Sequence, residues 1–198
     1  MTRIDDFNVA PGSAPSRSIG VIELSSIAVG YRVQDDMLKA AKVELLVART
    51  ICSGKYMVIF TGSVTDVRAA IEEGLRTSGE AVIDHLVIPH VHESVLPALG
   101  QSVVLEPAQA QALGVVESYS GTSIIAAADA AAKAARVTLF RVHVAMAVGG
   151  KGFLLLTGEQ SAVASAVAAA AAEVRQRGLL VGEVVIPRPS RELFGEYI

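Results

Sequence analysis

The sequence has few of the residues on which most binding and catalytic chemistry depends. Its 198 residues include one cysteine and no tryptophan; aromatic residues make up 5% and charged residues 19%, with a net charge of −3. A single cysteine excludes an internal disulfide and a multi-thiolate metal site within one chain. The weak charge and scarce aromatic residues argue against nucleic acid as a partner. Since no cysteine can pair, the composition favours a reducing compartment and predicts a cytosolic location.

Long apolar runs are also lacking. The longest stretch of small and apolar residues, 161–174, is too short to span a bilayer, which needs ~20 residues. We therefore interpret it as an alanine-rich helix and expect no membrane partner. Residues 1–18 are polar and lack the apolar region of a signal peptide, which predicts a flexible tail. Apolar residues nevertheless make up 52% of the chain, enough for a substantial core.

The chain does contain an internal repeat. Residues 19–45 match residues 113–139 at an offset of 94, with 10 of 27 positions identical. Further along, GKYMVIFTG at 54–62 matches GKGFLLLTG at 150–158, where the offset has become 96. A repeat of this length indicates a duplicated domain rather than a solenoid unit.

The repeat also predicts the domain boundaries. A third match joins LVIPHV at 86–91 to VVIPRP at 184–189. We therefore expect a first domain at 19–100, a linker at 101–112 and a second domain at 113–198. Length changes between the matches fall in predicted loops, where they are tolerated.

Each half shows the same succession of patterns, strand-helix-strand-strand-helix-strand-helix. Ser63 followed by Asp66 predicts the N-terminus of the long helix in the first half. Glu159 and Gly178 mark the start and end of the corresponding helix in the second half. Two helices on a four-stranded sheet predict a compact α/β sandwich for each half.

Several motifs occur in both halves. They are GVIEL and GVVES on the first strand, Asp-x-x-x-Lys-Ala-Ala at 35–41 and 129–135, and Gly-Lys before the third strand; VIPRP closes the second half. Together they resemble the bacterial microcompartment shell family over residues 19–197, in its unpermuted tandem form. The resemblance implies a mixed α/β (α+β) fold of two ferredoxin-like domains, each with a four-stranded antiparallel sheet and flanking helices.

The resemblance also implies an assembly. Tandem chains of this family form homotrimers shaped like hexamers, which tile with hexameric and pentameric shell proteins around a pore on the three-fold axis. The loop between the second and third strands of each half would line that pore. The expected pore-lining residues are Thr50, Ile51, Cys52, Ser53 and Gly54 from the first half, and Ala147, Val148, Gly149 and Gly150 from the second.

In a trimer, the single cysteine acquires partners. Three copies of Cys52 around one axis could hold a [4Fe–4S] cluster with one iron left for an outside ligand, as the resemblance implies. Zinc bound by three thiolates and a water is an alternative. A third reading is that Cys52 is a small buried hydrophobe, as many cysteines outside disulfides are.

Four further residues are expected at the edge of the assembly. Lys39 and Lys133 occupy equivalent positions, and the resemblance places them where neighbouring assemblies meet; the alternative is a solvated helix face. Arg188 matches an edge arginine of the family, and His90 stands at the equivalent position of the first half. Because histidine titrates near neutrality, contacts through His90 would depend on pH.

The sequence contains no convincing set of catalytic residues. His90 and His92 have no third metal ligand in view, and Glu23 and Glu117 repeat without a partner base or nucleophile, so we expect a structural role for both carboxylates. The glycine-containing loops do not match a phosphate-binding motif. We therefore predict a non-enzymatic shell building block whose pore conducts electrons or metabolites. The alternative is a trimeric sensor that binds a small molecule between ferredoxin-like subunits.

Overall fold

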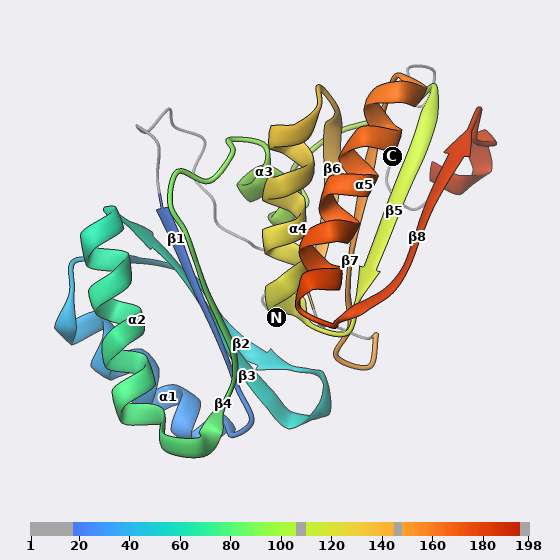
Figure 1. Cartoon of the computed structure of the whole chain (residues 1–198). Coiled ribbons are helices and arrows are strands. Elements are labelled where there is room, and N and C mark those ends of the chain that lie inside the picture. Colours follow the sequence, from blue (N-terminus) through green and yellow to red (C-terminus); the bar gives the residue numbers. More distant parts are fainter. Residues whose placement is uncertain (1–17, 106–109, 145–147, 195–198) are drawn as a thin grey trace. The chain divides into compact units, whose positions relative to one another are not determined.

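The computed structural model describes residues 18–105, 110–144 and 148–194. They form two compact units (Figure 1). The first unit holds the described residues up to Val91 together with Val148–Gly150, and the second holds His92–Val144 and the residues from Lys151 onward. This division differs from the predicted one, because the end of the predicted first domain, from His92, groups with the second unit.

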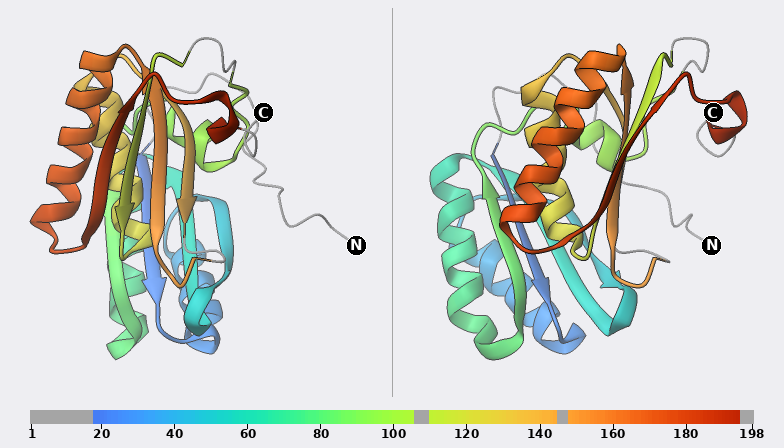
Figure 2. Two further views of the ribbon diagram at one scale, coloured as in Figure 1. Left: turned by 90° about the vertical axis from the view of Figure 1, so that its right-hand side faces the viewer. Right: turned by 45° about the vertical axis from the view of Figure 1, so that its right-hand side comes forward.

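The first unit is a four-stranded antiparallel sheet with two helices on one face (Figures 1 and 2). Its strand order is β2-β3-β1-β4, so the first strand of the chain lies inside the sheet. The elements are β1 (Ser18–Leu24), α1 (Ile27–Ala40), β2 (Glu44–Ile51), β3 (Lys55–Gly62), α2 (Val64–Ser78) and β4 (Val82–Ile88).

The second unit repeats this topology in the order β6-β7-β5-β8, which confirms the predicted fold of each half. Its elements are α3 (Val95–Leu99), β5 (Ala112–Ser118), α4 (Gly121–Ala134), β6 (Thr138–Val144), β7 (Gly152–Gly158), α5 (Gln160–Gln176) and β8 (Leu180–Pro187). Two details differ from expectation. Helix α3, predicted to close the first half, packs on β6, and the second half ends in a short 3-10 turn, Arg191–Phe194, in place of a second α3.

The helix ends are set by the residues that the sequence analysis identified. The backbone N–H of Asp66 donates to the Ser63 hydroxyl at 3.1 Å, so the predicted start of α2 is confirmed. Glu159 precedes α5, and Gly178 follows it with a φ of 71°, the left-handed conformation in which glycine commonly ends a helix.

Where the first long helix of each unit crosses the strand beneath it, one of the two facing residues is glycine, and the two units place this glycine on opposite elements. In the first, a β-carbon on Gly30 of α1 would lie 2.6 Å from the β-carbon of Tyr56 on β3, so the large ring requires a glycine opposite it. In the second, the equivalent positions hold Ile124 and Gly152, and here it is the strand residue that is glycine. Close packing of protein interiors leaves no room for two side chains at this crossing.

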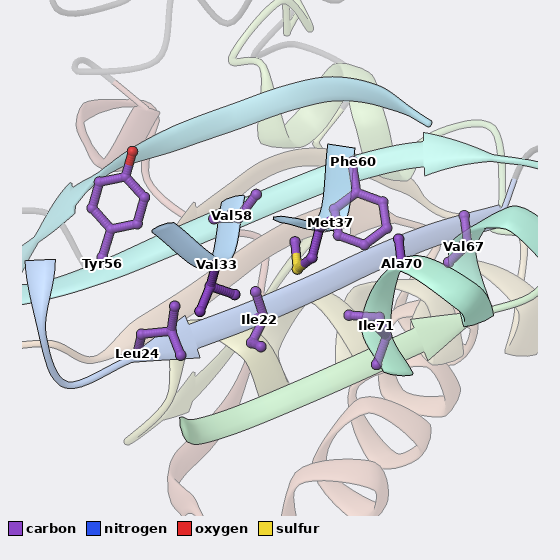
Figure 3. Close-up of a cluster of buried hydrophobic side chains, with 10 residues drawn as sticks. All are labelled: Ile22, Leu24, Val33, Met37, Tyr56, Val58, Phe60, Val67, Ala70 and Ile71. Carbon is purple, nitrogen blue, oxygen red and sulfur yellow. The ribbon is translucent and has the colours of Figure 1, made fainter. Parts of the chain in front are cut away.

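Tyr56 belongs to the core cluster between the helices and the sheet of the first unit. Figure 3 shows this cluster of ten buried side chains, which come from β1, α1, β3 and α2. Met37 faces Gly74 there, because a β-carbon on Gly74 would meet the Met37 sulfur at 2.5 Å. The equivalent pair of the second unit is Ala131 and Ala170, both fully buried.

Part of the predicted linker is also core. Leu105 is 5% exposed and packs with Leu113, Phe140, Leu155 and Phe194 of the second unit. Val103 and Ala110 pack against the same cluster. The described residues of 101–112 therefore help to bury the sheet of the second unit instead of only connecting two domains.

Candidate functional site

The loop that carries Cys52 is a tight hairpin between β2 and β3. Ile51 pairs with Lys55, so only three residues make the turn. Ser53 and Gly54 both have left-handed backbones, with φ values of 67° and 70°. A serine adopts this conformation less readily than glycine does, so the turn holds Ser53 in a sparsely populated region.

The second hairpin, between β6 and β7, has the same local backbone. Gly149 and Gly150 have φ values of 65° and 84°, and Gly149 stands at the position equivalent to Ser53. Ala147, one of the expected pore-lining residues, lies outside the described residues.

The expected pore-lining residues are not equally accessible. Thr50, Ser53 and Gly54 are exposed and Cys52 is half-buried, so the tip of the first hairpin presents a hydroxyl and a thiol. Ile51 is only 5% exposed, and its side chain packs inside the protein. Val148 is half-buried, Gly149 exposed and Gly150 buried. In the single chain the accessible part of the expected lining is therefore Thr50, Cys52–Gly54 and Val148–Gly149.

Each hairpin is tied to its sheet by an ion pair that the sequence analysis missed. Lys55 donates to the Glu23 carboxylate at 2.8 Å, and Lys151 donates to the Glu117 carboxylate at 2.9 Å. Both lysines directly follow the left-handed turns. The hydrogen bond to Glu117 raises the pKa of Lys151 above its ordinary value. The repeated Glu and the repeated Gly-Lys were both visible in the sequence, and only the strand register joins them.

The expected edge lysines are also paired within their own helices. Lys39 is ion-paired with Asp35, and Lys133 donates to Asp129 at 2.6 Å, both at the i,i+4 spacing that favours such contacts. The hydrogen bond that Lys39 donates to Asp35 raises the pKa of Lys39. Because each pair sits on one helix face, the aspartates hold the ammonium groups at defined positions on the surface.

The other two expected edge residues share an unusual backbone. His90 and Arg188 follow the Ile-Pro sequence at or just after the end of the last strand of each half, and their φ values are 54° and 49°. Left-handed residues other than glycine are uncommon and cluster at functional positions. The backbone N–H of Arg188 donates to the carbonyl of Gln111 at 2.9 Å, which fixes the turn against the start of β5.

The structure gives His92 a local role. Its imidazole Nδ1 lies 2.9 Å from the Ser94 hydroxyl, and its backbone N–H donates to Asp129 at 2.8 Å. Within residues 18–105, 110–144 and 148–194, no group of three or more His, Cys, Asp or Glu side chains could hold a metal ion. A metal site that uses Cys52 would accordingly need thiols from several chains.

No described helix combines the length and the apolar character needed to cross a membrane.

Comparison with known proteins defines the class of the chain. The model of the BMC domain, the domain of bacterial microcompartment proteins, matches it twice, at residues 18–91 and 112–189. The chain therefore belongs to the BMC domain family, in which it carries two domains in tandem.

Its particular relatives are shell and assembly proteins. The chain is 43% identical to the bacterial microcompartment shell protein PduT of Citrobacter freundii over 92% of its own length and 98% of the relative. It is 31% identical to the carboxysome assembly protein CcmO of Synechocystis, over 90% of this chain and 64% of that protein. At a coarse level the chain is thus a microcompartment shell protein.

Solved structures agree with this fold. A microcompartment protein from Desulfitobacterium hafniense aligns with a TM-score of 0.82 and 41% identity, over 90% of this chain and 98% of that one. The fused permuted shell protein MSM0275 aligns with a TM-score of 0.61 at 22% identity, over 83% of this chain and 84% of that one, which shows likeness of fold alone.

Proposed function

We propose that the chain is a non-catalytic building block that forms a homotrimer shaped like a hexamer and tiles with other shell proteins. The observation that carries this proposal is the duplication itself, because two domains of one fold give a six-domain ring when three chains close head to tail. The relatives named as shell and assembly proteins support the same role.

A helix face of the first unit supports contact with another copy. Ile27, Tyr31 and Leu38 lie along one side of α1 and are 37%, 63% and 38% exposed. Their equivalents at the start and middle of α4, Gly121 and Ile125, are buried. The exposed apolar face of α1 is therefore a candidate surface for contact with another copy.

The proposed pore is formed by three copies of each hairpin. The fit of an iron–sulfur cluster can be judged from the donor set: Cys52 is half-buried next to an exposed turn, and three chains would supply the three thiolates of a cluster with one open iron. When bound, such a cluster would supply one-electron transfer. The chain's own contribution is to hold Cys52 at the tip of a short hairpin anchored by the Glu23–Lys55 ion pair.

Without a cluster, the same hairpins would surround a conduit for small molecules. The accessible polar groups at their tips are the Thr50 and Ser53 hydroxyls and the backbone of the left-handed turns. Which of the two uses applies depends on the metal content of the trimer, which the Cys52 prediction in the Discussion measures.

Assembly at high concentration tests the shell role against the sensor alternative. We expect the purified protein to form extended sheets or tubes visible by electron microscopy. A trimer that stays discrete at every concentration, and whose melting temperature rises with a small molecule, would contradict the shell role and support a sensor.

A further inference from the structure

The two Glu–Lys ion pairs are equivalent in sequence but differ in their surroundings. In the first unit the Glu23 side chain is fully buried and the Lys55 side chain is 24% exposed. In the second unit the Glu117 and Lys151 side chains are each 38% exposed. The same pair is therefore covered at one position and open at the other.

A glycine turn lies against the covered pair. Gly150, which groups with the first unit, is placed so that a β-carbon on it would be 3.9 Å from the Lys55 ammonium nitrogen. This turn is the left-handed pair Gly149–Gly150, and the buried state of Gly150 fits its position against Lys55. Within the first unit, Gly150 thus lies against the lysine of the Glu23–Lys55 pair.

The equivalent hairpin tip has the same shape. Ser53 and Gly54 are left-handed, as Gly149 and Gly150 are, and both residues are exposed. Equivalent tips and equivalent pairs make equivalent contacts when repeats follow one another around a ring. One contact of this kind is made inside the chain, while the other tip and the other pair are both left accessible.

We infer that the Glu117–Lys151 pair, with Tyr119, receives the Ser53–Gly54 turn of a neighbouring copy. The inference rests on the proposed homotrimer and assigns it a specific contact, one that fixes the hairpin carrying Cys52. Lys151 offers an ammonium group held by Glu117 to the backbone carbonyls of the incoming turn. The partner is a second copy of this chain.

Tyr119 supports the assignment of the exposed Glu117–Lys151 pair as a docking surface. Tyr119 is 59% exposed, and the centroid of its ring lies 5.9 Å from the Lys151 ammonium nitrogen, within the range of a cation–π contact. The equivalent residue of the first unit is Ser25, a small side chain. Tyrosine is enriched at protein interfaces, because it gives a large contact area at little conformational cost.

Cross-linking between a thiol and an amine tests the contact. In the Cys52→Ser background, Ser53→Cys places the only thiol on the turn without adding a new left-handed side chain. A short reagent that joins thiols to amines should then link this position to Lys151 of another chain, giving species of two and three chains on a denaturing gel. Lys151→Arg, which keeps the charge and removes the amine, should reduce these species at least tenfold, while Lys55→Arg should leave them unchanged.

The internal contact supplies the matched control. Gly149→Cys in the same background places the thiol at the position equivalent to Ser53, and it should link to Lys55 within one chain. Native mass measurement of the same samples gives the oligomeric state. A trimer that shows the Gly149→Cys link but no Lys151-dependent link between chains overturns this inference and leaves the proposed trimer standing. A monomer overturns both.

Discussion

Cys52 is held by its neighbours more firmly than its place on a loop suggests. The turn is three residues long, two of its residues are left-handed, and the lysine that follows is bound to a buried glutamate. Each feature removes freedom from the hairpin. A thiol on such a turn has a reproducible position, which is what convergence of three copies at one axis requires.

Replacing Cys52 by serine should abolish iron binding without changing the trimer. Reconstitution with ferrous iron and sulfide under anaerobic conditions should give about four irons per wild-type trimer, the content of one [4Fe–4S] cluster. Cys52→Ser should bind almost none, because a hydroxyl is a poor substitute for a thiolate. Iron and sulfide analysis with EPR spectroscopy measures both.

Ser53→Gly is the control for the loop. It keeps the thiol and gives the turn the residue found at the equivalent position, Gly149, so iron binding should match wild type. Equal iron and sulfide in Cys52→Ser and wild type would show that the cysteine is only structural, and the proposed electron transfer would have to be abandoned.

Arg188→Gly should prevent tiling without affecting folding. Glycine adopts a φ of 49° without strain and keeps the backbone hydrogen bond to Gln111, so we expect the free energy of unfolding to change by less than about 1 kcal/mol. The trimer should persist while extended sheets are lost, which electron microscopy can show. Gln101→Gly, another left-handed position with a φ of 55°, is the control and should still form sheets. If Arg188→Gly formed normal sheets, Arg188 would not contribute to contacts at the edge of the assembly.

Between elements, the crossing of α1 and β3 follows a rule that both repeats obey. One of the two facing positions is glycine, on the helix in the first unit and on the strand in the second. The exchange compensates in size, since Tyr56 fills in one unit the space that Ile124 fills in the other. Helix and strand have therefore changed together within each repeat.

This rule predicts that the effect of Gly30→Ala on the free energy of unfolding depends on the residue at position 56. Gly30→Ala alone should lower the free energy of unfolding by about 2–3 kcal/mol, because the new β-carbon would overlap the Tyr56 side chain. In a Tyr56→Gly background the same change should be neutral or stabilising by about 0.5–1 kcal/mol, since alanine is a better helix former than glycine.

Tyr56→Ala is the discriminating control. It keeps the β-carbon that lies 2.6 Å from the new one, so Gly30→Ala should remain destabilising there. Urea unfolding of the six proteins gives the coupling free energies. Equal effects of Gly30→Ala in all three backgrounds would show that the crossing relaxes freely and that the rule does not hold.

At the scale of the molecule, the proposed six-domain ring needs three chains. Native mass measurement at micromolar concentration should give a homotrimer that persists at moderate ionic strength, because the exposed apolar face of α1 would contribute a salt-insensitive contact. Tyr31→Glu, which places a charge on that face, should shift the trimer toward monomer. A stable wild-type monomer or dimer would rule out the proposed ring.

The sequence predicted the duplication, the order of elements apart from the helix expected after β8, and the starts of α2 and α5, because these depend on local patterns. It did not reveal the Glu23–Lys55 pair, whose members are 32 residues apart and meet only through the register of β1 and β3. The left-handed backbones of His90 and Arg188 could not be predicted, because neither position holds a glycine. The grouping of α3 with the second unit is a matter of tertiary packing, which local patterns do not encode.

The opposite solutions at the helix–strand crossing also bear on how the chain folds. Tandem repeats risk misassembly, in which a strand of one repeat inserts into the other while the polypeptide is still collapsing. If β3 took the place of β7, Tyr56 would collide with Ile124, and if β7 took the place of β3, Gly152 would leave a void beside Gly30. We therefore expect the divergence of these four residues to disfavour exchange of β3 and β7 between the two halves during folding.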